Sequence, residues 1–134
     1  MPNLKMVEGI GDVYAQKLQD AGVATTDSLL EMGATPQGRK SIAERSGIPI
    51  ALILRWVNHV DLYRINGVGE EFADLLEAAG VDTVPELAQR IPENLYQKMM
   101  TVNEEENRVR QLPSETQISS WVEQAKKLPR VISH

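Results

Sequence analysis

The sequence predicts an all-α protein built from two diverged copies of one helical unit, which pack together as one compact structural domain. Three observations support this prediction. The 134 residues are 42% hydrophobic but include only one Phe, two Trp and three Tyr, so aliphatic side chains must fill the core, which suits helix-on-helix packing. No run of β-branched residues alternates with polar residues long enough to form a sheet. A glycine-containing pattern also occurs twice, which indicates an internal repeat.

The repeat becomes visible when residues 7–12 are compared with residues 65–70, which lie 58 positions later. The matched pairs at this offset are Gly9 and Gly67, Gly11 and Gly69, Ala15 and Ala73, Leu18 and Leu76, Gly22 and Gly80, Thr25 and Thr83, and Leu29 and Leu87. Further along, Trp56 matches Trp121 at an offset of 65, so the second copy contains seven additional residues, which we place between residues 91 and 113. We therefore expect one repeat over residues 1–63 and another over residues 64–134.

In the first copy, capping residues, glycines and prolines mark the ends of four helices. We expect these helices over residues 12–21, 25–32, 36–45 and 49–61. Gly22 follows the first helix and can adopt the left-handed conformation that ends it. Thr25 or Thr26 caps the second helix, and Thr35 followed by Pro36 is a typical opening for the third. In the fourth helix, apolar residues recur every three or four positions and predict one buried face.

The second copy repeats this order of helices. Thr83 and Glu86 have the spacing of a capping box, with Pro85 early in the helix that they open. A further helix is expected over residues 93–102, and the charged stretch over residues 103–110 either continues or loosens it.

The last helix of each copy carries a tryptophan. In the second copy Ser114 and Gln117 open this helix and Pro129 ends it. Trp56 and Trp121 could serve in stacking or at an interface. Their equivalent positions on apolar helix faces favour core packing, in which each indole covers the hairpin of its own copy.

Charge and composition narrow the classes of partner. The net charge of −5 argues against a broad basic face for nucleic acid. Residues 1–63 contain six Lys and Arg against seven Asp and Glu, whereas residues 64–134 contain eight against twelve, so a polyanion site fits the first copy better. The absence of cysteine excludes disulfides and cysteine metal sites. With no leader and no apolar run longer than residues 48–54, we expect a cytoplasmic protein without a membrane partner.

We do not expect an enzyme. His59 and His134 lie far apart in the sequence, and no paired spacing of His, Asp and Glu is typical of a metal site. The glycines at positions 9 and 11 do not form a dinucleotide-binding pattern. Residues 104–106 are consecutive glutamates, which point in different directions on a helix and predict a solvated face. The sequence therefore indicates no catalytic residues, no metal, no cofactor and no small-molecule substrate.

The two glycine patterns resemble the signature of helix-hairpin-helix (SAM-like) proteins, in which hydrophobic-Gly-hydrophobic-Gly precedes a helix that carries Ala. The residues that carry this resemblance are Ile10, Gly11, Ala15 and Leu18 after Gly9, and Val68, Gly69, Ala73 and Leu76 after Gly67. Over nearly its whole length the chain also resembles a bacterial family of tandem helix-hairpin-helix proteins that is described as a domain of unknown function. That wider resemblance rests on residues 38–39, 42–44, 56–58, 61–69 and 121–129. It implies the architecture and no established activity.

The resemblance implies a mode of binding, because helix-hairpin-helix modules bind the DNA backbone without reading bases. Backbone N–H groups of the hairpin and the positive end of the following helix face a phosphate oxygen. The implied contact residues are Gly9, Ile10 and Gly11 in the first copy and Gly67, Val68 and Gly69 in the second. The candidate cations near them are Lys5, Lys17, Arg39, Lys40 and Arg64.

Acidic residues follow both hairpins and leave the function open. Many DNA-binding hairpins carry Lys or Arg where this chain has Asp12, Glu70 and Glu71. An acidic residue in the first turn of a helix can simply complement the helix dipole, which contributes about 0.3–1 kcal/mol. The glycines can likewise serve packing alone. The alternatives are a sequence-independent nucleic-acid-binding module, with the first repeat favoured, and a protein–protein interaction or scaffold module. Backbone binding should weaken steeply with salt, and an apolar protein interface should not.

Overall fold

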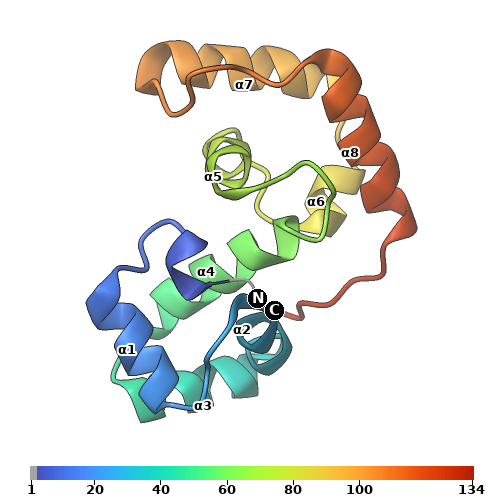
Figure 1. Ribbon diagram of the computed structural model, residues 1–134. Coiled ribbons are helices and arrows are strands. Elements are labelled where there is room, and N and C mark those ends of the chain that lie inside the picture. The colour runs from blue at the N-terminus through green and yellow to red at the C-terminus, as the bar shows by residue number, and fades with distance from the viewer. Residues whose placement is uncertain (1–2) are drawn as a thin grey trace. The chain divides into compact units, whose positions relative to one another are not determined.

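The computed structural model describes residues 3–134, and these residues form α-helices and one short 3-10 helix without any strand (Figure 1). The all-α prediction is confirmed. The chain divides into two compact units. Unit 1 comprises the described residues up to Asp61 together with Val131–His134, and unit 2 comprises Leu62–Arg130. No described helix has both the length and the apolar character needed to cross a membrane.

Unit 1 contains the four α-helices predicted for the first copy and, before them, a short 3-10 helix that the sequence did not indicate. They are η1 (Leu4–Met6), α1 (Asp12–Asp20), α2 (Thr26–Met32), α3 (Pro36–Ser46) and α4 (Ile50–Leu62), the last of which ends at the boundary of the unit. Two of the predicted caps are confirmed. The Thr25 hydroxyl accepts a hydrogen bond from the N–H of Ser28 at 3.1 Å, and the Thr35 hydroxyl accepts one from the N–H of Gly38 at 3.0 Å. Gly22, at φ 93°, follows the end of α1 as predicted.

Helix α4 contributes several apolar residues to the core of unit 1. Ile53, Trp56, Val57 and Val60 of this helix are buried. Helix α1 packs on η1 and α3, and α2 packs on α3. The other buried apolar residues include Leu4, Val7, Ile10, Leu18, Val23, Leu29, Ile42, Ile48 and, from the far end of the chain, Ile132.

The segment Val131–His134, which we call the strap, lies against the loop between α2 and α3 (Figure 1). The N–H of Ser133 donates to the carbonyl oxygen of Ala34 at 2.8 Å. Arg39 donates from Nη1 to the carbonyl oxygen of Gly33 at 2.9 Å and from Nη2 to that of Ser133 at 2.8 Å. The arginine is 4% exposed, and burial lowers its pKa. The strap is thus part of the fold of unit 1.

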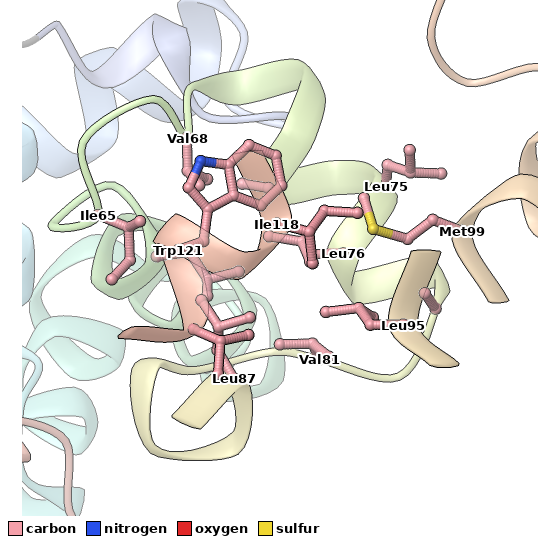
Figure 2. Close-up of a cluster of buried hydrophobic side chains, with 14 of the residues drawn as sticks. Ile65, Val68, Leu75, Leu76, Val81, Leu87, Leu95, Met99, Ile118 and Trp121 are labelled. Carbon is pink, nitrogen blue, oxygen red and sulfur yellow. The ribbon is translucent and has the colours of Figure 1, made fainter. Parts of the chain in front are cut away.

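Unit 2 contains α5 (Glu70–Ala78), α6 (Val84–Ala88), α7 (Pro92–Glu106) and α8 (Glu115–Lys127). Helix α8 packs on α6 and α7, and α5 packs on α7. Figure 2 shows the resulting core, in which Trp121 and Ile118 of α8 meet aliphatic side chains of the other three helices. The charged stretch that follows residue 102 continues α7 as far as Glu106, and Asn107 ends the helix in a left-handed conformation at φ 51°.

One of the two predicted capping boxes in unit 2 is confirmed and the other is wrong. The Ser114 hydroxyl accepts a hydrogen bond from the Gln117 N–H at 3.1 Å, and the Gln117 side chain accepts one from the Ser114 N–H at 2.9 Å. Thr83 makes no such side-chain cap. Glu86, the other residue of that predicted box, is paired with Arg90, whose Nη2 lies 2.9 Å from its carboxylate.

Candidate functional site

The turn that precedes α1, which we call hairpin 1 (residues 7–11), has the same backbone geometry as hairpin 2 (residues 65–69), which precedes α5. In hairpin 1, Gly9 has φ 94° and the N–H of Ile10 donates to the carbonyl oxygen of Val7 at 3.0 Å. The corresponding values in hairpin 2 are φ 97° at Gly67 and 3.1 Å between the N–H of Val68 and the carbonyl oxygen of Ile65. A positive φ of this size strongly favours glycine, so the first glycine of each hairpin is required by the turn.

The second glycine of each hairpin is the N-cap of the following helix. Gly11 and Gly69 are extended, at φ −90° and −107°, and neither caps its helix through a side chain. A Cβ atom at either position would meet nothing within 4 Å. The first-turn N–H groups of α1 and α5 have no partner inside their helices, as at any helix N-terminus. The backbone is therefore open to a ligand at these two points, and neither glycine is required by its φ.

The first glycine of each hairpin rests on a tryptophan. Trp56 is 1% exposed and Trp121 is 2% exposed. The indole Nε1 atoms are the nearest atoms to the positions where a Cβ would stand, at 3.2 Å for Gly9 and 3.0 Å for Gly67. Figure 2 shows the indole nitrogen of Trp121 turned toward hairpin 2 at Val68. The prediction that each tryptophan covers the hairpin of its own copy is confirmed.

A second aromatic ring accompanies each tryptophan. Tyr14 of α1 lies 5.2 Å from Trp56 between ring centroids, and Phe72 of α5 lies 5.3 Å from Trp121. Both pairs are tilted, which is a favourable arrangement for aromatic rings. The sequence comparison did not single out these two rings, although residues 14 and 72 are also 58 positions apart and are both aromatic. Similarity of type, in addition to identity, would have found them.

The charged side chains around hairpin 1 balance one another. Lys5 Nζ lies 2.6 Å from Asp12 Oδ1, and both side chains are exposed. The hydrogen bond from Lys5, together with its positive charge, holds the pKa of the Asp12 carboxyl below its usual value. Lys17 is exposed one turn further along α1, with its Nζ 6.0 Å from the centroid of the Tyr14 ring. Glu8 is also exposed, so these four charged side chains sum to zero.

Hairpin 2 differs from hairpin 1 in charge and in its backbone contacts. The positions equivalent to Lys5 and Lys17 hold Tyr63 and Leu75, and two glutamates, Glu70 and Glu71, open α5. The side chain of Gln124 on α8 holds the backbone of Asn66 through both of its polar atoms. Its Oε1 accepts from the Asn66 N–H at 2.8 Å, and its Nε2 donates to the Asn66 carbonyl oxygen at 3.3 Å.

The structure assigns different roles to the other candidate residues. The side chains of Ile10 and Val68 are buried and their N–H groups are already hydrogen-bonded, so they support the hairpins from within. Arg39 does not belong to the hairpin surface, because its guanidinium is buried under the strap. Lys40 is exposed on α3, and Arg64 is half-buried. Among residues 3–134, no cluster of three or more Asp, Glu or His side chains could hold a metal ion.

Comparison with known proteins identifies one family. The profile of a family described as "Domain of unknown function (DUF4332)" matches residues 8–128, which include hairpin 2, all of hairpin 1 except Val7, and all of the α-helices. Neither a curated protein nor a solved structure matches the chain.

Proposed function

The chain belongs to this family of domains of unknown function, and from that premise we propose that it is a non-catalytic helix-hairpin-helix module that binds nucleic-acid phosphates at hairpin 1. The observation that carries the proposal is the open N-cap at Gly11, where a Cβ would meet nothing within 4 Å, directly after the rigid turn at Gly9. A bacterial, cytoplasmic setting is part of this proposal.

The geometry of Gly11 suits a phosphate oxygen. The first-turn N–H groups of α1 lack partners within the helix, and the helix dipole adds a partial positive charge at the same end. Glycine at the N-cap allows the ligand to approach the backbone closely. Contacts of this kind fix a nucleic-acid strand by its phosphates and carry no base sequence information. Binding at hairpin 1 would accordingly be independent of sequence.

Charge favours hairpin 1 over hairpin 2. The carboxylate of Asp12 at the start of α1 is already paired with Lys5, and Lys17 supplies a second exposed cation. In unit 2, two carboxylates, Glu70 and Glu71, stand in the first turn of α5 where α1 has one, and the position equivalent to Lys5 holds Tyr63. This difference in formal charge disfavours a phosphate at hairpin 2.

Fluorescence anisotropy with labelled single-stranded and duplex DNA, measured across a salt series, tests the proposal. We expect binding that does not depend on sequence and that weakens linearly in log K against log salt, as counterion release requires. Gly11→Ala should reduce the affinity several-fold because its methyl group stands in the open approach, whereas Gly69→Ala is the matched control and should bind like the wild type. Circular dichroism verifies that both variants are folded. Absence of binding at low salt, or equal losses in the two variants, would contradict the proposal.

A protein-interaction or scaffold role is the second candidate, and exposed apolar residues of unit 1 favour it. Val13, in the first turn of α1, is 68% exposed, and Met6, at the end of η1, is 44% exposed. Single exposed apolar residues are common, so this observation carries less weight than the open backbone at Gly11. The discriminating measurement is a pull-down at low and high salt with the wild type and Val13→Ser. A protein partner that is retained at high salt and lost with Val13→Ser would support this role over nucleic-acid binding.

A further inference from the structure

The indole N–H of Trp56 is a buried hydrogen-bond donor for which the described residues supply no acceptor. Buried tryptophan N–H groups usually find a hydrogen-bond acceptor. Trp56 is 1% exposed, yet no hydrogen bond joins its N–H to an acceptor among the described residues. The one polar atom of this almost fully buried side chain therefore has no acceptor within residues 3–134.

Gly9 lies beside this atom and has no side chain to fill the space next to it. It is exposed, and a Cβ built on it would stand 3.2 Å from Nε1. Any side chain at this position would therefore cover the indole N–H, whereas glycine leaves it open. The requirement for a positive φ and the opening above the indole coincide at the same residue.

We infer that the indole N–H of Trp56 is a ligand donor, which acts together with the first-turn N–H groups after Gly11 on one phosphodiester group. The inference rests on the proposed function and adds a side-chain donor to it. The two peptide units between Gly9 and Gly11 span at most about 7 Å. Gly9 adjoins the indole nitrogen, and Gly11 directly precedes the first-turn amides of α1. One phosphate offers two free oxygens, each of which bonds over about 2.9 Å, so it can accept from donors at both positions. The ligand class is an oxyanion with at least two free oxygens, as a nucleic-acid phosphate has.

Trp121 serves as an internal reference for this inference. Its Nε1 lies 3.0 Å from the corresponding Cβ position at Gly67, and it also has no acceptor in the part of the chain that the structure describes. The start of α5 beside it carries Glu70 and Glu71, with no lysine equivalent to Lys5. We therefore expect an anionic ligand to reach Trp56 and not Trp121.

The test is a ¹⁵N–¹H correlation spectrum of the full chain during titration with a short single-stranded oligothymidylate at low salt. The protein has two tryptophans, so it gives two indole cross-peaks, which Trp56→Phe and Trp121→Phe assign. We expect the Trp56 indole peak and the Gly11 amide peak to shift along one saturable curve, while the Trp121 indole peak stays in place. Trp56→Phe keeps an aromatic ring but loses the N–H, and should weaken binding by about tenfold, as for a hydrogen bond to a charged group. Trp121→Phe is its matched control.

Each outcome separates this inference from the proposed function. If the Gly11 amide shifts while the Trp56 indole does not, or if folded Trp56→Phe binds like the wild type, the indole is not a donor and phosphate binding at hairpin 1 still stands. If neither the amide nor the indole responds, both ideas are wrong. If Trp56→Phe fails to fold, the shift of the indole peak in the wild-type spectrum decides the matter alone.

Discussion

At the scale of single residues, the two glycines of hairpin 1 have separate reasons to be glycine. Gly9 stands at φ 94° with an indole nitrogen 3.2 Å from the position of its missing Cβ, so both its backbone and its surroundings exclude a side chain. Gly11 is extended and has open space around it. Stability should therefore depend on the first glycine, and ligand access should depend on the second.

Alanine substitutions separate these two roles. Gly9→Ala should lower the free energy of unfolding by about 1–3 kcal/mol, the usual cost of a side chain in a sparsely populated backbone region. Gly67→Ala should cost at least as much, because its Cβ would lie 3.0 Å from the Trp121 nitrogen. Gly11→Ala should change the stability by less than about 0.5 kcal/mol. Urea unfolding followed by circular dichroism measures all three. Equal losses at Gly9 and Gly11 would show that the hairpin geometry is wrong.

The pair formed by Lys5 and Asp12 predicts a dependence on pH. Since the pKa of Asp12 is lowered in the folded state, the pair contributes stability above the ordinary carboxyl pKa of about 4 and loses it as the pH falls through the lowered folded-state value. Lys5→Gln should return the pKa of Asp12 toward its usual value. Lys17→Gln, which removes an exposed lysine that has no ion pair with Asp12, should leave it unchanged. Carboxyl ¹³C shifts followed against pH provide the measurement, and an unchanged Asp12 titration in Lys5→Gln would contradict the assigned cause.

At the residue scale, a prediction from the sequence is confirmed where matched positions of the two copies have the same structural role. The equivalent positions of Trp56 and Trp121 predicted that each tryptophan covers the hairpin of its own copy, and the structure confirms this. The placement of Arg39 among the surface cations did not succeed. Its partner is the carbonyl oxygen of Ser133, which is 94 residues away, and no local pattern in the sequence indicates a contact over that distance.

At the scale of helices, the sequence predicts the ends well when the capping group lies within the same turn. Thr25, Thr35 and Ser114 each accept the expected hydrogen bond from a backbone N–H three residues later. The capping box predicted for Thr83 and Glu86 is absent, although these residues have the same spacing as Ser114 and Gln117. Arg90 binds Glu86 and also donates to the carbonyl oxygen of Gly80, which ties the end of α5 to α6.

The capping box at α8 gives a prediction with an internal control. Ser114→Ala removes the hydroxyl that accepts the Gln117 N–H, and should cost about 1 kcal/mol of unfolding free energy. Thr83→Val removes a hydroxyl that caps nothing while keeping the shape of the side chain, so it should cost less. Urea unfolding of both variants makes the comparison. A larger loss in Thr83→Val than in Ser114→Ala would mean that the caps are assigned incorrectly.

At the scale of the whole molecule, unit 1 is assembled from two separate stretches of chain, whereas unit 2 is one continuous stretch. The matching geometry of the two hairpins could be predicted from the sequence, because repeats leave a fixed offset. The return of residues 131–134 to unit 1 could not, since the sequence comparison describes which positions are equivalent and not which stretches fold together. The boundary between the repeats at residue 63 follows from the equivalence of positions alone, and it stays a prediction.

The strap can be tested through its buried arginine. Arg39→Met should lower the free energy of unfolding by about 2–3 kcal/mol, because the carbonyl groups of Gly33 and Ser133 both lose their donor. Ser133→Pro should weaken the same contact by removing the N–H that binds Ala34. Arg130→Met, at an exposed position, is the matched control. Hydrogen exchange should speed up in α2 and α3 for the first two variants alone, and identical exchange in Arg39→Met and Arg130→Met would contradict the assignment.

The discontinuity of unit 1 has a consequence for the order of events on the ribosome. Ile132 and Ser133 are synthesised after every residue of unit 2, so unit 1 cannot complete its core until unit 2 has been synthesised. Until then, the site that receives Ile132 stays open to solvent, and Arg39 lacks its second carbonyl acceptor. We therefore expect that unit 1, although most of it is synthesised first, completes its core only after the last residues of the described chain have been added.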